Sequence, residues 1–181
     1  MEARENTPRA GRVLILIGDG KGKTTSALGT ALRCVGHGMR VLVVQFVKNR
    51  PCGEHAAAGK LGKLLEIRLA GTGFLPAEGK PLPEKAVEAA QSALRQAAHA
   101  LASGRFGLVV LDEVLYALRR GLIAADDIRH AVTDRAEGVH VILTGDGPWE
   151  DLADLADTVT RMGNVRHAME NGRPPDPGIE F

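Results

Sequence analysis

The sequence has 181 residues, which at roughly 150 residues per domain predicts a single domain. Its 23 Lys and Arg residues nearly balance 22 Asp and Glu residues, and the resulting net charge of +1 argues against bulk electrostatic binding to nucleic acid or to an anionic membrane. Aromatic residues make up only 3% of the chain, which disfavours a site built by stacking bases or sugars on aromatic rings.

Membrane and secretory signals are missing from the sequence. No apolar run approaches the ~20 residues of a membrane span, and the polar N-terminus has no apolar segment of the kind that secretory signals contain. The two cysteines, Cys34 and Cys52, form neither a disulfide framework nor a zinc motif, and they suit a reducing cytosol. We therefore expect a cytoplasmic protein with no membrane or nucleic-acid partner.

Short apolar runs alternate with helical patterns along the chain. The runs predict buried strands at residues 12–17, 41–47, 64–69, 108–111 and 139–144. Apolar residues at helical spacing predict helices over residues 27–35, 83–103 and 124–132. Residues 48–63 are predicted as a loop with one helical turn, 71–83 as a second loop, 1–11 as a short N-terminal arm and 171–181 as an extended tail.

Helices that regularly separate buried strands imply an α/β fold with a mostly parallel sheet flanked by helices. Ligands of such sheets bind at the carboxyl ends of the strands. The segments that suggest chemistry all fall at those ends, at residues 18–25, 45–48, 71–74, 112–113 and 145–146. We therefore expect one ligand-binding edge, within a single nucleotide-binding domain over residues 1–181.

A glycine-rich segment, GDGKGKTT, lies between the first predicted strand and the first helix, where a P-loop would lie. Its glycines let backbone amides converge on phosphate, Lys23 supplies a point charge, and Thr24 offers a hydroxyl to Mg²⁺. The usual first glycine is replaced by Ile17, so a glycine-rich turn without a ligand is the alternative. Two lysines in a tight turn favour an anion between them. The candidate ATP-binding residues are Gly18, Asp19, Gly20, Lys21, Gly22, Lys23, Thr24 and Thr25.

The fourth predicted strand, LVVL, ends in Asp112-Glu113, which is the Walker B pattern. One carboxylate would hold the Mg²⁺ of MgATP, and the other could orient a ligand or a water molecule. An acidic pair in this position can also be only a helix N-cap. Combined with the P-loop, it predicts a metal site made of Thr24, Asp112 and Glu113.

These motifs together resemble the P-loop type of ATP:corrinoid adenosyltransferase, whose phosphate loop has the form GNGKGKTT and also lacks the first glycine. VVQFVK at residues 43–48 is similar to the family's VVQFIKG, with Gly53-Glu54 in the following loop. GTGF at 71–74 is similar to GTGFTW, LDE with Tyr116 to LDExxY, LADTV at 155–159 to LADTVS, and GIEF at 178–181 to the family's C-terminal motif. The similarity runs from about Arg12 to the last residue.

The resemblance implies a P-loop NTPase fold of the RecA-like type and a corrinoid substrate whose cobalt is reduced to Co(I). The cobalt would attack C5′ of MgATP and expel triphosphate, in adenosylcobalamin synthesis or salvage. It also implies a homodimer and a reductant, for which a flavin protein is a candidate. Lys21 and Lys23 would be the catalytic residues, because they offset charge on the departing triphosphate. The candidate corrinoid-binding residues are Phe74, Gln45, Lys48 and Glu54. Packing of Phe74 and simple solvation of the three polar side chains are the alternatives.

Two positions depart from the family pattern. Pro76, two residues after Phe74, stands where the family has a Trp, and Asp146 stands where the family has an Arg. In the family the aromatic pair helps to exclude the lower axial ligand of cobalt, so we expect this chain either to prefer incomplete corrinoids or to use another apolar group such as Leu75. A non-catalytic ATP- or corrinoid-binding protein and a P-loop kinase of a small metabolite remain the alternative functions.

The expected role of Phe74 can be tested by Phe74→Ala. Turnover of base-containing cobalamin should fall more than turnover of cobinamide, because only the former has a lower ligand to exclude. The measurement is the rate of adenosylation of each corrinoid. An equal loss for both substrates would mean that Phe74 serves only packing.

Overall fold

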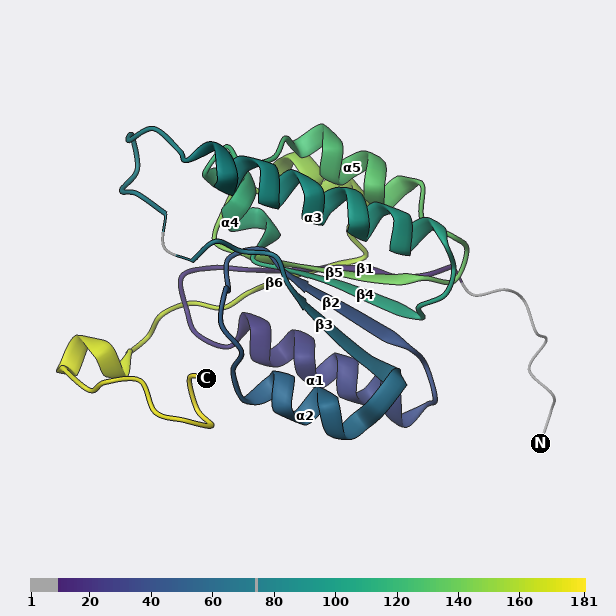
Figure 1. The fold of residues 1–181 in the computed structure, drawn as a ribbon, viewed down its shortest axis with the longest axis horizontal. Coiled ribbons are helices and arrows are strands. Elements are labelled where there is room, and N and C mark those ends of the chain that lie inside the picture. The colour runs from purple at the N-terminus through teal and green to yellow at the C-terminus, as the bar shows by residue number, and fades with distance from the viewer. Residues whose placement is uncertain (1–9, 74) are drawn as a thin grey trace.

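The computed structural model describes residues 10–73 and 75–181, which form a six-stranded sheet covered by helices on both faces (Figure 1). The strands are β1 (Val13–Ile17), β2 (Val41–Gln45), β3 (Leu65–Leu69), β4 (Leu108–Asp112), β5 (His140–Gly145) and β6 (Thr158–Arg161). The α-helices are α1 (Lys23–Gly36), α2 (Gly53–Leu61), α3 (Glu84–Ala102), α4 (Val114–Arg119) and α5 (Ala125–Thr133). Short 3-10 helices cover η1 (Gly62–Leu64), η2 (Glu150–Leu155) and η3 (Ala168–Asn171).

All strand pairs of the sheet are parallel, in the order β3-β2-β4-β5-β1-β6. The prediction of an α/β fold with a mostly parallel sheet is therefore confirmed. One strand, β5, separates the strand that precedes the glycine-rich loop from the strand that ends in Asp112. This order agrees with the expected P-loop NTPase type of sheet.

Each face of the sheet has its own apolar core, because successive side chains of a strand point to opposite faces. Figure 1 shows α3, α4 and α5 on one face and α1 and α2 on the other. Ile15, Val109 and Leu143 pack toward the first group of helices, whereas Val43 and Val110 pack toward the second. Burial on both faces explains why these strands are nearly continuous apolar runs in the sequence.

The sixth strand was not predicted. All four residues of β6, TVTR, are exposed, and the strand pairs with β1 along one edge only. Such a strand has no apolar run and no inward-facing alternation for a sequence pattern to detect. Its place beside β1 comes from tertiary pairing.

Helix α2 corrects the prediction of a loop over residues 48–63. The segment GEHAAAGKL contains two glycines, and Ala58 is its one buried residue, so no apolar stripe marks it as a helix. The backbone N–H of Cys52 donates to Nδ1 of His55 at 3.0 Å and thereby fixes the start of the helix. The first two residues of the helix, Gly53 and Glu54, line the same cavity as the glycine-rich loop.

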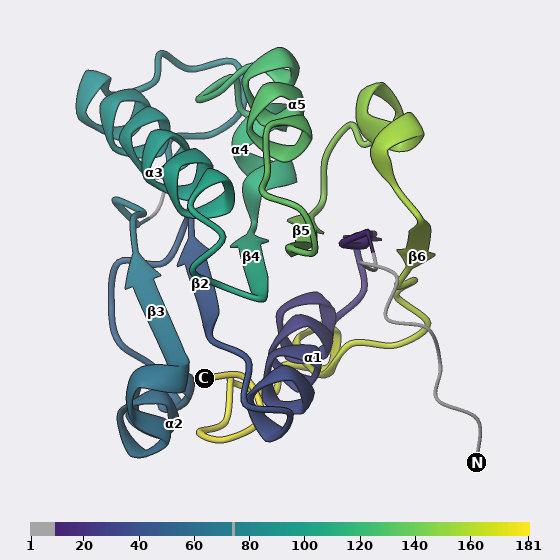
Figure 2. The same cartoon turned by 90° about the vertical axis from the view of Figure 1, so that its right-hand side faces the viewer.

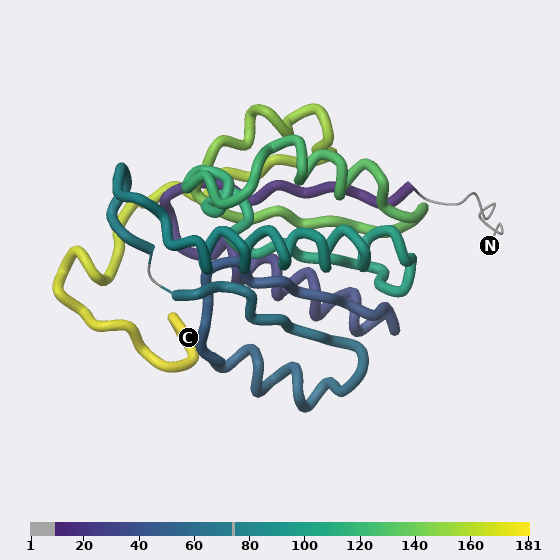
Figure 3. The backbone as a smooth tube through the Cα atoms, turned by 45° about the horizontal axis from the view of Figure 1, so that its top comes forward, coloured from purple at the N-terminus to yellow at the C-terminus, as the bar shows by residue number. Residues whose placement is uncertain are grey.

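The C-terminal tail also differs from the extended segment predicted over residues 171–181. Residues 173–176 have no regular structure, but residues 177–180 form a turn in which the N–H of Gly178 donates to the Phe181 carbonyl at 2.7 Å. The backbone tube in Figure 3 shows this tail returning toward the edge of the sheet. Figure 2 shows its end close to α1 and α2.

Across the described ranges, no helix is long and apolar enough to cross a membrane.

Helix α3 approaches the sheet through small side chains. Its buried residues include five alanines, at positions 86, 90, 93, 97 and 100. Alanine lets a helix lie close to its neighbours, so these positions leave no room for larger groups.

We expect Ala97→Leu to lower the free energy of unfolding by about 1–3 kcal/mol, because Ala97 is fully buried and extra methyl groups would overpack the core. Urea denaturation measures this loss. The matched control is Ala102→Leu on the exposed end of the same helix, which should change stability little. Equal stability of the two variants would contradict the close packing of α3.

Candidate active site

The glycine-rich loop joins β1 to α1 and depends on glycine at three positions. Gly18 and Gly22 have φ angles of 113° and 112°, a region that favours glycine. A Cβ on Gly20 would lie 2.7 Å from the Met162 carbonyl oxygen, to which the Gly20 N–H donates at 2.9 Å. The loop leads directly into the N-terminus of α1, which begins at Lys23. Free backbone N–H groups at a helix N-terminus favour an anion.

A cavity of about 430 Å³ opens beside this loop. Its walls come from the phosphate loop and α1, from the start of α2, from the end of β4 and from the C-terminal tail. The lining residues are Gly20, Lys21, Gly22, Lys23, Thr24, Thr25, Leu28, Lys48, Gly53, Glu54, Glu113, Gly178, Ile179, Glu180 and Phe181. Segments far apart in the sequence thus meet at one edge of the sheet, as the ends of parallel strands predict.

Lys23 lies across the loop that precedes it. Its ammonium donates to the carbonyl oxygens of Gly18 at 2.7 Å and Gly20 at 3.0 Å. Lys21 instead points to the tail, where its Nζ lies 2.9 Å from Oε1 of Glu180. Both predicted catalytic lysines line the cavity, and the ammonium group of each contacts oxygen atoms of the protein itself. Asp19 accepts a hydrogen bond from the Asn164 N–H at 3.2 Å and so ties the loop to the segment after β6.

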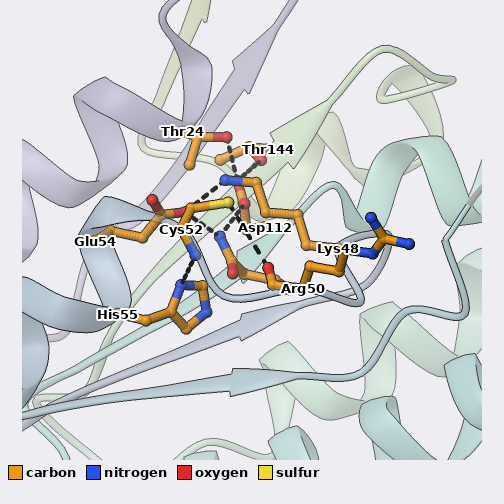
Figure 4. A network of polar contacts seen from close by, with 9 residues as sticks. Thr24, Lys48, Arg50, Cys52, Glu54, His55, Asp112 and Thr144 are labelled. Carbon is orange, nitrogen blue, oxygen red and sulfur yellow. Dashed lines mark hydrogen bonds and ion pairs between the residues drawn. The ribbon is translucent and has the colours of Figure 1, made fainter. Parts of the chain in front are cut away.

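Asp112 is the buried centre of the polar network in Figure 4. Its carboxylate is 1% exposed, and three side chains donate to it. Thr24 and Thr144 each donate to Oδ1 at 2.8 Å, and the Gln45 amide donates to Oδ2 at 3.2 Å. The structure therefore brings together Thr24 and Asp112, two of the three residues that the sequence assigned to a metal site.

Thr144 is a residue of this site that the sequence analysis missed. Its hydroxyl accepts from the Glu113 N–H at 2.8 Å while donating to Asp112, so one buried side chain orients both residues of the acidic pair. The signal lay in the sheet: Leu111 pairs with Leu143, and the next residues of the two strands are Asp112 and Thr144. The sequence alone does not show that β4 and β5 are neighbours, so it does not reveal that Asp112 and Thr144 lie at the ends of adjacent strands.

Glu113 follows Asp112 in an uncommon backbone conformation. It is the one non-glycine residue with positive φ in the described part of the chain, at 61°. Burial raises the pKa of its carboxyl, and the neighbouring charge of Asp112 raises it further, whereas Lys23 acts in the opposite direction. Glu113 lines the cavity. A cation bound close to its carboxyl would favour the ionised form.

Gln45, Lys48 and Glu54, which the sequence offered as corrinoid contacts, are joined in one chain of contacts, of which Figure 4 labels Lys48 and Glu54. The buried Gln45 amide bridges Asp112 and Oε1 of Glu54, and Lys48 forms an ion pair with the same oxygen of Glu54. Burial alone would raise the pKa of Glu54, but hydrogen bonds from Lys48 and Gln45 hold it below its usual value. Lys48 and Glu54 line the cavity, whereas Gln45 reaches it only through its neighbours.

A smaller cavity of about 300 Å³ shares Lys48 with the first. It is lined by Val47, Lys48, Asn49, Arg50 and Gly73. Lys48 therefore belongs to the walls of both cavities. The predicted corrinoid contact Phe74 adjoins Gly73 but lies outside the described residues.

The two positions that depart from the family pattern are both engaged by arginines. Asp146 forms an ion pair with Arg119, which also lies 3.3 Å from Glu78. Arg120 donates to the Pro76 carbonyl at 2.6 Å and to the Tyr116 hydroxyl at 2.7 Å. These contacts link the loop after β3 to the helix after β4.

The residues of the site fit a magnesium ion that arrives with a phosphate ligand. In the described ranges no group of three or more His, Cys, Asp or Glu residues has the arrangement of a metal site. Thr24 and Glu113 nevertheless bring oxygen donors to the cavity wall, with the buried Asp112 directly behind Thr24. Mg²⁺ is commonly held by one or two such groups together with substrate phosphates. The donor set therefore suits Mg²⁺ in a nucleotide complex.

The lowered pKa of Glu54 predicts a pH-dependent contribution to stability. Because the carboxyl binds its proton less readily when folded, its contribution is present above the unfolded pKa and is lost as the pH falls through the folded pKa. We expect the stability difference between the wild type and Glu54→Gln to shrink as the pH falls from 7 toward 3. Urea denaturation of both proteins across this range measures it, and a constant difference would contradict the Glu54–Lys48 pairing.

Comparison with known proteins identifies the family. The model of the family described as ATP:corrinoid adenosyltransferase BtuR/CobO/CobP matches residues 9–181. The corrinoid adenosyltransferase of Pseudomonas aeruginosa is 37% identical over 172 residues, which cover 94% of this chain and 84% of that protein. Those of Escherichia coli K12 and Salmonella typhimurium are 35% and 36% identical, again over 94% of this chain and 86% of each relative. The chain therefore belongs to the ATP:corrinoid adenosyltransferase family.

Proposed function

We propose that this protein transfers the 5′-deoxyadenosyl group of ATP to the Co(I) centre of a corrinoid and releases triphosphate. The observation that carries the proposal is that Lys48 lines both the phosphate-loop cavity and the cavity beside Gly73. ATP in the first cavity and a corrinoid at the second would meet at this residue. The chain belongs to a family described as ATP:corrinoid adenosyltransferase, and this description names the same kind of reaction.

In the proposed reaction, cobalt attacks C5′, a Co–C bond forms, and the C5′–O bond breaks with its electron pair leaving on the triphosphate. Co(I) is itself a strong nucleophile, so the chain needs no nucleophile or general base of its own. The protein has to hold C5′ close to the cobalt and to stabilise charge on the leaving group. Lys21, Lys23 and the free N–H groups at the start of α1 are the groups in the cavity that suit the second task.

Thr24, Asp112 and Glu113 would hold Mg²⁺ together with the phosphates. When bound, the ion supplies positive charge that offsets the charge of the triphosphate. Thr144 and Gln45 keep the Asp112 carboxylate in place through their hydrogen bonds, and Thr144 also fixes the backbone of Glu113. Binding of a cation would favour the ionised form of Glu113, whose pKa burial raises in this structure.

Phe74, Lys48 and Glu54 are the proposed corrinoid-side residues, with Gln45 acting through Glu54. Pro76 stands where the family pattern has a Trp, and Arg120 holds this part of the loop by donating to the Pro76 carbonyl. We propose that this loop accepts incomplete corrinoids more readily than base-containing ones. Comparing turnover of cobinamide and cobalamin tests this preference, and equal turnover would contradict it.

A kinase is less well supported, because its lid usually brings arginines to the transferred phosphate. Arg119 and Arg120 would be the nearest candidates, but they are paired with Asp146, Glu78, Tyr116 and the Pro76 carbonyl. Neither belongs to the walls of the phosphate-loop cavity. A non-catalytic ATP- or corrinoid-binding protein is the remaining alternative.

We further propose that residues 1–181 act as a single domain in the cytoplasm, as a homodimer, with Co(I) supplied by a flavin-containing reductant protein. Sedimentation of the purified protein tests the dimer. Replacing a chemical reductant by a reduced flavodoxin-type protein in the turnover assay tests the reductant.

The decisive experiment is an anaerobic assay with the purified protein, MgATP and chemically reduced cobinamide or cobalamin. The expected result is the spectral change from Co(I) to a light-sensitive alkyl-cobalt, with one triphosphate released for each product. ADP in place of triphosphate would support a kinase. ATP binding without any product would support the binding-protein alternative.

We expect Lys23→Ala to lower the rate of adenosyl transfer by about 30- to 10³-fold, or about 2–4 kcal/mol, because a charge-stabilising contact to the phosphates is lost. Lys60→Ala on the exposed side of α2 removes the same charge away from the cavity and serves as the control. Thermal unfolding of both variants checks that the loop still folds. Unchanged turnover of folded Lys23→Ala would contradict the phosphate-loop assignment.

A further inference from the structure

The last four residues of the chain form one wall of the phosphate-loop cavity, although they are about 160 positions from the loop in sequence. A turn fixes their shape: the Glu180 N–H donates to the Asp176 carbonyl at 2.9 Å. The Asp176 N–H in turn donates to Oε2 of Glu180 at 2.8 Å. The other oxygen of Glu180 is thereby directed at Lys21, at 2.9 Å.

Each cation in the walls of this cavity already has an internal acceptor. Lys23 donates to carbonyls of its own loop, Lys48 pairs with Glu54, and Lys21 pairs with Glu180. A polyphosphate that binds here has to replace some of these acceptors. The carboxylate of Glu180 is the acceptor best able to leave, because it belongs to a tail segment and not to the loop or to a helix that packs on the sheet.

The tail is attached to the cavity by few apolar contacts. The side chains of Ile179 and Phe181 are 68% and 48% exposed, so moving them costs little buried surface. The Lys21 and Glu180 side chains are 41% and 20% exposed, and ion pairs in contact with water contribute little to stability. The Phe181 carbonyl lies close to Gly53, where an added Cβ would be 3.7 Å away. The segment therefore covers the cavity without being built into the core.

We propose that the C-terminal segment Gly178–Phe181 is a working part of the nucleotide site, in which Glu180 pairs with Lys21 as seen here and a bound polyphosphate takes the place of the Glu180 carboxylate. This rests on the proposed function, since it assumes that the cavity binds a nucleoside triphosphate. Glu180 then lowers the affinity for polyphosphate, because its carboxylate competes with the ligand for Lys21. Displacement of Glu180 also moves Ile179 and Phe181 at the mouth of the cavity.

The test is equilibrium binding of two probes, MgATP without corrinoid and inorganic triphosphate, to the wild type and to Glu180→Gln. Glutamine keeps the size of the side chain and removes its charge. We expect both probes to bind about two- to fivefold more tightly to Glu180→Gln, the range that loss of one water-exposed ion pair permits. Glu66→Gln is the matched control, since Glu66 also forms an exposed ion pair, with Arg68, but lies outside the cavity.

A second variant, a chain ending at Pro177, separates competition from other roles of the tail. The same gain in affinity for inorganic triphosphate is expected, because Lys21 is again left free. Weaker binding of the probe to this variant would show that the tail attracts the ligand, and would overturn the proposal. Equal affinities of Glu180→Gln and Glu66→Gln would overturn it as well.

Failure of the proposed function would look different. If the wild type, Glu180→Gln and Glu66→Gln all bind neither MgATP nor inorganic triphosphate, the phosphate-loop cavity is not a nucleotide site, and both proposals fall. If the wild type binds MgATP and only MgATP binding responds to Glu180→Gln, the tail acts on the nucleoside, which overturns the competition at Lys21 alone.

Discussion

The buried carboxylate of Asp112 is the group on which the arrangement of the site depends. A carboxylate with 1% exposure is costly unless its oxygens are satisfied, and here three donors from three separate elements satisfy them. Thr24 brings the start of α1, Gln45 the end of β2 and Thr144 the end of β5. The hydrogen bonds that satisfy one anion therefore also fix the relative positions of the phosphate loop and two neighbouring strand ends.

From Asp112 the polar contacts extend outward toward both cavities. Gln45 donates to Glu54, and Glu54 pairs with Lys48, which lines both the phosphate-loop cavity and the cavity beside Gly73. On the other side, Thr144 joins Asp112 to the strained backbone of Glu113. The interior of the site is thus fixed by hydrogen bonds to a buried carboxylate, and polar side chains lie at the cavity walls. Such a hydrogen-bonded arrangement supports positioning, which is the main task that the proposed reaction leaves to the protein.

Much of this could be predicted from the sequence, because the information was local. Strands buried on both faces give continuous apolar runs, and the glycine-rich loop between β1 and α1 carries its own spacing, so the sheet class followed from pattern alone. The same patterns singled out Thr24 and Asp112, which the structure joins by a hydrogen bond. The features that were missed depend on tertiary pairing. The exposed strand β6 has no apolar signal, α2 has no amphipathic face, and Thr144 matters only because β5 lies beside β4. The ion pair between Lys21 and Glu180 joins opposite ends of the chain, which no local pattern reports.

The close approach of Gly20 to Met162 has a consequence for how this protein is handled in the laboratory. The phosphate loop is held by the stretch of chain that leads out of β6, and the same stretch continues to Phe181 at the mouth of the cavity. Residues appended after Phe181, such as a purification tag, would therefore begin at a wall of this cavity. Such an extension would place added atoms next to the cavity even if every residue of the phosphate loop were intact.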